Sequence, residues 1–299
     1  MGTHAGGALT TADENILIGK EAGAGITTGA FNVFIGYEAG DGHDTESDNI
    51  GIGRSALGGP IAGGEHNVCI GQSAGDAITS AEYNIFIGQD TGTAATSGGG
   101  NVAVGYNAGS AIVEGTLNVM AGLSAGAGVS SGSNNLILGK DAGRTGSPGG
   151  NITTASNIIA LGDELIDTCH IQTDWTVASD KRDKTDIESI KMGLDFINKL
   201  EPITYRWDKR SKYNKDLNTT PTGKHKENWL DTGFLAQDVE VLEEEYGYKI
   251  EDNTNLTTYL SRDGKQYGLT YAKFVPILTK AIQELSAEVK ELKTKLEAK

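Results

Sequence analysis

An asparagine followed four residues later by a glycine recurs through the first half of the chain, and this repeat constrains the fold more than any other feature. Successive asparagines lie 17 residues apart, with one spacing of 18. The eight copies are Asn15/Gly19, Asn32/Gly36, Asn49/Gly53, Asn67/Gly71, Asn84/Gly88, Asn101/Gly105, Asn118/Gly122 and Asn135/Gly139. A looser copy follows at Asn157 and Gly162. A fixed period of this length predicts stacked units that bury a core only against their neighbours.

The unit itself favours strands over helices. Apolar bursts such as Ile85-Phe86-Ile87 are short and bounded by glycine, which is a poor helix former. We therefore expect an all-β repeat shaft over residues 1–162, of the β-solenoid or β-roll kind. Asparagine side chains bond to neighbouring backbone, so stacked copies predict a ladder along the shaft. Because aromatic residues make up only 6% of the chain, a single solenoid would have a thin core, and we expect the shaft to be trimeric.

The composition changes abruptly near residue 178. Of the 42 glycines, 36 precede Ser179. Lys and Arg number 4 against 18 Asp and Glu before this point, and 21 against 22 after it. This contrast predicts two unlike bodies: the shaft over 1–162 and a C-terminal domain over 179–299, with a neck or linker over 163–178.

Composition also excludes several classes of function. The net charge of −15 comes without any Lys/Arg-rich run, so we predict no nucleic-acid partner. No apolar run approaches the ~20 residues needed to span a bilayer, so we predict no membrane insertion. The 5 histidines and 2 cysteines are scattered without ligand-like spacing, and we predict no metal and no cofactor.

The C-terminal body mixes helix and strand patterns, which predicts an α+β domain. Thr185 and Glu188 have the spacing of a capping box, which predicts a helix that ends before Pro202. Alternating apolar residues over 203–207 predict a strand, and 237–245 a helix. The last segment, about 272–299, is predicted to form a coiled coil, since its apolar residues are spaced alternately by three and four. An amphipathic helix packed on its own domain is the alternative reading.

Ser179 lies five residues before Lys184 at the junction. A lysine at the positive end of a helix would lose its charge more readily, whereas Asp183 and Asp186 favour the charged form. A neutral lysine is a general base, and a serine within its reach is a candidate nucleophile. The spacing alone favours a solvated, charged linker over such a catalytic pair.

The C-terminal body resembles the intramolecular chaperone domain of phage tailspikes and tail fibres, the endosialidase type. The matching segments are 178–187 (ASDKRDKTDI), 200–207 (LEPITYRW), 233–239 (GFLAQDV), Tyr271 and 281–285 (AIQEL). One departure is visible, because this chain has Glu243-Glu244-Glu245 where the family usually has a proline near the end of a helix.

The resemblance implies a specific chemistry. Ser179 and Lys184 match a serine–lysine dyad that releases the domain autocatalytically, as a serine endopeptidase acting once on its own chain. The implied cleavage site is Ser179–Asp180. Attack of the Ser179 hydroxyl on its own carbonyl would close a strained four-membered ring, however, whereas attack on the Ala178 carbonyl closes a five-membered one. Cleavage before Ser179 therefore stays open as an alternative.

The repeats resemble the head units of trimeric autotransporters and the shafts of phage tail fibres. Together the two resemblances imply a homotrimeric virion appendage, made in the host cytoplasm, with a host-surface glycan or protein receptor as a further partner. The alternatives are a cell-surface or secreted adhesin that uses the same helper domain, and a glycan-binding tailspike. A plain spacer without any binding role is equally compatible with the repeats.

Overall fold

The computed structural model describes residues 2–298, which fall into two compact units. The first runs to Ile166 and includes Lys215–Leu217, and the second comprises Asp167–Asn214 and Asn218–Lys299. Among the described residues no helix is both long and apolar enough to cross a bilayer.

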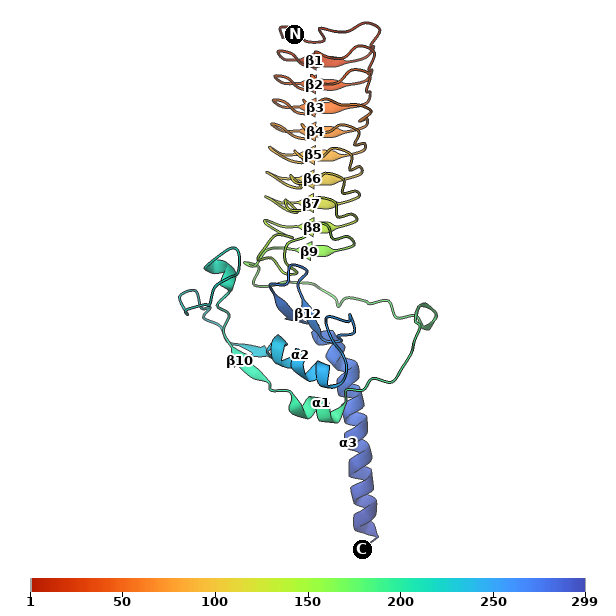
Figure 1. Cartoon of the computed structure of the whole chain (residues 1–299), viewed down its shortest axis with the longest axis vertical. Helices are drawn as coiled ribbons and strands as arrows, with labels where there is room; N and C mark the ends of the chain where they lie inside the picture. The colour runs from red at the N-terminus through yellow and green to blue at the C-terminus, as the bar shows by residue number, and fades with distance from the viewer. Residues whose placement is uncertain (1, 299) are drawn as a thin grey trace. The chain divides into compact units, whose positions relative to one another are not determined.

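The first unit is a parallel β-solenoid with one strand in each repeat (Figure 1). Each strand pairs in parallel with the next one along the chain, so that Ile16 lies opposite Val33 and Ile18 opposite Ile35. This arrangement confirms the all-β repeat fold expected from the 17-residue period. The nine strands are β1 (Ile16–Ile18), β2 (Val33–Ile35), β3 (Ile50–Ile52), β4 (Val68–Ile70), β5 (Ile85–Ile87), β6 (Val102–Val104), β7 (Val119–Ala121), β8 (Leu136–Leu138) and β9 (Ile159–Leu161).

The core of the solenoid is built from the middle residue of each strand and a second apolar column. Phe34, Phe86 and Met120 occupy middle positions and are fully buried. Ile26 and Ile78 belong to the second column and are also fully buried. A single chain therefore closes its own core. Alanines and aliphatic side chains fill the narrow interior without many aromatic rings, and the trimeric shaft stays a prediction.

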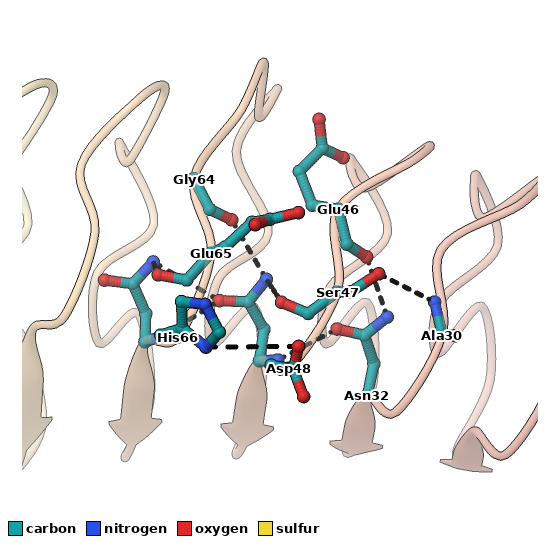
Figure 2. Close-up of polar contacts among 10 residues, drawn as sticks. Ala30, Asn32, Glu46, Ser47, Asp48, Gly64, Glu65 and His66 are labelled. Atoms are coloured by element: carbon teal, nitrogen blue, oxygen red, sulfur yellow. Dashed lines mark hydrogen bonds and ion pairs between the residues drawn. The ribbon is translucent and has the colours of Figure 1, made fainter.

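Buried asparagines join one rung of the solenoid to the next. The backbone N–H of Asn49 donates to Oδ1 of Asn32 at 3.0 Å, and Nδ2 of Asn32 donates to the carbonyl oxygen of Glu46 at 2.9 Å (Figure 2). The same backbone-to-amide bond recurs from Asn32 to Asn135. The predicted ladder is thus confirmed. An unpaired buried amide would cost about 1–3 kcal/mol, so few residues other than asparagine suit this place.

The asparagine ladder ends at the ninth rung, where the residue next to Asn157 takes the ladder position. The backbone N–H that bonds to Oδ1 of Asn135 belongs to Ile158, which lies 23 residues further along. Asn157 instead pairs with Asn134 through their side chains at 2.7 Å. The looser copy at Asn157 and Gly162 therefore forms a ninth rung in which Ile158 takes the ladder position. The longer spacing inserts an extra turn before β9, and isoleucine has no amide to continue the ladder.

Glycine is required where each strand of the solenoid ends. Gly36 has φ +145°, and a Cβ there would lie 2.3 Å from the carbonyl oxygen of Gly53 on the next rung. No side chain fits that distance. The glycine of the Asn-to-Gly motif is therefore fixed by close approach between rungs as well as by its backbone conformation.

The second unit is an α+β body, as the sequence predicted. Its apolar core contains Met192, Phe196, Val239, Phe274 and Ile277. Two small antiparallel sheets pair β10 with β11 and β12 with β13. The elements are η1 (Lys181–Asp183), α1 (Leu194–Lys199), β10 (Ile203–Tyr205), η2 (Arg210–Lys212), β11 (Asp231–Gly233), α2 (Ala236–Glu245), β12 (Thr258–Leu260), β13 (Tyr267–Leu269), η3 (Tyr271–Lys273) and α3 (Phe274–Glu297).

The helix predicted to start at the Thr185 capping box begins nine residues later, at Leu194. Its first turn is capped from a distance, because the backbone N–H of Leu194 donates to Oε2 of Glu284 at 2.7 Å. A Cβ at Gly193 would lie 2.2 Å from the same carboxylate, so only glycine leaves enough space for the Glu284 side chain. The prediction was wrong because the cap comes from α3 rather than from the local sequence. Lys184 consequently does not lie at the start of a helix.

The Glu243 carboxylate, at the departure from the family pattern, is fully buried and ties α2 to β12. It accepts hydrogen bonds from the backbone N–H and hydroxyl of Thr257 at 2.6 and 2.7 Å, and from the hydroxyl of Thr258 at 2.5 Å. A buried carboxylate is stable only with such donors. The end of this helix is therefore fixed by side-chain bonds to the neighbouring strand.

His43 is a polar residue in the second apolar column of the solenoid, 17 residues after Ile26. It is fully buried, and neither ring nitrogen has a hydrogen-bond partner among the described residues. Its ring lies 4.6 Å from that of Phe34. Burial lowers the pKa of His43 to about 4, although the neighbouring Glu46 carboxylate acts in the opposite direction.

Acid should therefore weaken the shaft through His43. The unfolded chain takes up a proton near pH 6.5 and the folded shaft only near pH 4, so stability is complete above pH 6.5 and falls between these values. The expected loss is about 3 kcal/mol. His43→Ile, which restores the residue type of Ile26 and Ile78, should remove this part of the loss. Chemical denaturation at several pH values measures it.

The exposed His170 provides the control for this prediction, because His170→Gln changes a histidine outside the solenoid core. It should leave the pH dependence as in the unmodified chain. Equal pH dependence in His43→Ile and in the unmodified chain would show that the carboxylates, not His43, cause the acid sensitivity.

Candidate functional site

The structure brings Ser179 and Lys184 together at the junction. Nζ of Lys184 lies 2.6 Å from Oγ of Ser179 and 3.2 Å from the carbonyl oxygen of the same serine. Both residues are exposed. One lysine nitrogen therefore contacts a hydroxyl and a peptide carbonyl at once.

A tight turn produces this contact. Asp180 is the N-cap of η1, and its backbone carbonyl accepts a hydrogen bond from the N–H of Asp183 at 3.2 Å. The N–H of Lys184 donates to the carbonyl of Lys181 at 3.3 Å. The chain thus reverses within five residues and returns Lys184 to Ser179. The spacing of the two residues is the length of one such turn.

Asp180 and Arg182 form an ion pair on the turn that the sequence analysis did not single out. Arg182 donates to the Asp180 carboxylate through its side chain, at 2.6 Å from one guanidinium nitrogen and 3.1 Å from Nε. The guanidinium holds the pKa of Asp180 below its usual value. The available sequence signal was an aspartate at an N-cap with an arginine two residues on.

The terminal helix α3 carries an exposed apolar seam. Its inner side packs into the domain through Phe274, Ile277 and Ala281. The predicted seam residues lie elsewhere on the helix, and each is 42–75% exposed. Packing on its own domain therefore accounts for only one side of the helix. The exposed seam consists of Val275, Leu278, Ile282, Leu285, Val289, Leu292 and Leu296.

The solenoid has an apolar outer face as well. The first and third residues of every strand point away from the core, and all of them are Ile, Val, Leu or Ala. The face therefore repeats nearly the same aliphatic pair at each rung, with most of these side chains half-buried and the rest exposed. Its most exposed members are Ile16, Ile18, Ile85, Val104, Val119, Ile159 and Leu161.

Comparison with known proteins identifies the region that contains the junction. Residues 179–248 match the protein family described as chaperone of endosialidase, which is classed among the peptidases. The segment is a chaperone-of-endosialidase domain. The match begins at Ser179, includes Lys184 and ends just after α2, so the solenoid and α3 lie outside it. No curated protein and no solved structure matches the chain.

The family match bears on the activity of the C-terminal region. Its family implies self-cleaving peptidase activity and a role in folding. The catalytic roles of Ser179 and Lys184 stay predictions, now with a contact of 2.6 Å between them. Among residues 2–298 no cluster of His, Cys, Asp or Glu is arranged to hold a metal ion.

Proposed function

We propose that the protein is a homotrimeric fibre whose C-terminal region, 179–299, directs trimer folding and then leaves by self-cleavage through Ser179 and Lys184. The observation that carries the proposal is the contact between these two side chains at the first residue of a chaperone-of-endosialidase domain. A solvated linker would give no reason for a lysine–serine contact at the first residue of the segment that matches the family.

The chemistry follows from the atoms in contact. Lys184, in its neutral form, takes the proton of the Ser179 hydroxyl while Oγ attacks a carbonyl carbon. The C–N bond breaks, the proton passes to the leaving amine, and an ester remains. Water then hydrolyses this ester, which leaves one new carboxylate and one new amine and restores the hydroxyl.

Two peptide bonds are open to this reaction. Oγ of Ser179 reaches the Ala178 carbonyl through a five-membered ring, which cleaves before Ser179. Cleavage of Ser179–Asp180 needs the hydroxyl of another copy, or a water molecule activated by the dyad. The 3.2 Å contact from Nζ of Lys184 to the Ser179 carbonyl supports the second bond, since it polarises that carbonyl.

Both exposed apolar surfaces support self-association. The seam of α3 has the spacing of a coiled coil, and the outer face of the solenoid offers a long aliphatic surface to a second copy. β-Branched residues alternating with leucine in the seam favour two strands in isolation, so a trimer rests on the resemblance to known fibres.

The solenoid face gives a reason for a folding helper. Because each rung presents nearly the same aliphatic pair, sliding one copy by one rung changes few contacts. The face therefore favours association without specifying register. A domain at the end of the chain that assembles first would set the register for the whole shaft.

The resemblance of the repeats to phage tail fibres supports a place in the virion, as an appendage that contacts a host-surface glycan or protein. A cell-surface or secreted adhesin would use the same junction chemistry and the same two surfaces. An upstream anchoring or export signal in the complete gene distinguishes these two settings.

Self-cleavage should depend on both members of the dyad. Ser179→Ala should leave an intact 31.3 kDa chain that still assembles, because the hydroxyl has no partner outside the turn. Lys184→Arg should also abolish cleavage, since arginine keeps the charge and the hydrogen bonding but does not act as a base at neutral pH. Mass spectrometry of freshly expressed protein measures the outcome, and the new N-terminus, Ser179 or Asp180, identifies the bond. Efficient cleavage of Ser179→Ala would exclude the dyad.

Cleavage should also wait for assembly. Leu285→Asp combined with Leu292→Asp places two charges in the α3 seam and should reduce both the oligomer and the cleavage product by at least tenfold. Ala287→Asp combined with Thr294→Asp, which adds the same two charges on the opposite side of the helix, is the matched control. Sedimentation and gel analysis of the same samples test the link. A monomeric seam variant that is cleaved at the normal rate would separate folding from release.

The shaft should need residues 179–299 to find its register. A chain that ends at Ala178 should give mixed or aggregated oligomers, because the aliphatic face attracts copies in several registers. The comparison is with the shaft released from the full-length chain, measured by sedimentation. A truncated shaft that forms a single soluble trimer with equal yield would remove the chaperone role.

A further inference from the structure

We infer that Arg182 is a positioning residue for the junction chemistry: its side chain clasps Asp180 and so holds the turn that returns Lys184 to Ser179. The inference rests on the proposed self-cleavage, and it adds a residue that acts through Asp180 rather than on the reacting atoms.

The contacts converge on one carboxylate. Oδ1 of Asp180 accepts the backbone N–H of Arg182 at 2.9 Å and its Nε at 3.1 Å. Oδ2 accepts the terminal guanidinium nitrogen at 2.6 Å. A carboxylate that holds backbone and side chain of the same arginine closes a small ring, and two parallel bonds from a guanidinium fix its geometry. This clasp spans the middle of η1.

The clasp matters because packing does not hold this turn. No residue of η1 is buried, and Ser179, Asp180 and Lys184 are exposed. The backbone bonds that close the turn are long, at 3.2 and 3.3 Å. Ordering several exposed residues costs about 1–2 kcal/mol each, so local hydrogen bonds decide how often the turn is populated.

Arg182 contacts the reacting pair only through Asp180. Its side-chain bonds within the described chain all go to Asp180, while Lys184 holds Ser179. Losing the guanidinium should therefore lower the fraction of chains in which Nζ of Lys184 reaches Oγ.

The neighbouring Lys181 supplies a matched control. It lies in the same η1 turn and carries the same charge, and among residues 2–298 its side chain makes no ion pair. Lys181→Ala thus removes one positive charge from the turn without touching the clasp. A purely electrostatic role for Arg182 would be shared by this neighbour.

The experiment follows cleavage of the full-length chain after synthesis, with rates taken on the sedimented oligomer and repeated across pH. Arg182→Ala keeps the backbone cap and should slow cleavage roughly twofold to fivefold, in line with the loss of an exposed ion pair. Arg182→Lys should lie between this variant and the unmodified chain, and Lys181→Ala should cleave normally. Asp180→Ala and the double variant Asp180→Ala/Arg182→Ala should cleave at the same rate, because Arg182 acts only through Asp180. The pH midpoint of the rate should be the same in all of them.

The failures of the two proposals are distinguishable. If Ser179→Ala is inert but Arg182→Ala cleaves at the normal rate, the clasp is excluded and the dyad stands. A shifted pH midpoint in Arg182→Ala would also overturn the inference, because it would show that Arg182 acts on the charge of Lys184. If Ser179→Ala is itself cleaved, the proposed function fails regardless of Arg182.

Discussion

The structure depends first on the asparagine that joins each rung of the solenoid to the next. Its side chain accepts a backbone N–H from the following rung and donates to a carbonyl there, so one residue pairs two backbone groups inside a dry core. The glycine four residues later allows the close approach of the rungs. The asparagine and the glycine recur in each repeat, and the strand between them carries the apolar pattern.

The demands of the asparagine and the glycine also produce the problem of assembly. A rung that must keep its asparagine and its glycine, and fill its core with a middle residue, leaves the first and third strand residues to face outward. In this chain those positions are aliphatic throughout. Because the outward residues are nearly the same at each rung, they do not specify the register between copies. In the proposed assembly, the separate C-terminal domain with its own apolar seam would set that register.

Sequence patterns predicted what is local or strictly periodic. The strands, the asparagine ladder, α2 and the exposed seam of α3 all follow from spacing alone. The start of α1 did not, because its cap is a carboxylate from α3, 90 residues away. The spacing also did not show that an inserted turn moves the ladder position of the ninth rung to Ile158. The contact between Ser179 and Lys184 was within reach of sequence reasoning, whereas the Asp180–Arg182 pair needed the geometry of the turn.

The contact between Ser179 and Lys184 does not by itself determine when the proposed cleavage occurs. Five residues bring Ser179 and Lys184 together, so a single chain already has the contact. The proposed reaction needs the neutral form of the lysine, however, because a protonated lysine accepts no proton from serine. Burial disfavours the charged form of a lysine. If neighbouring copies cover the turn, as in the proposed assembly, burial would favour the neutral lysine and would couple the proposed cleavage to assembly.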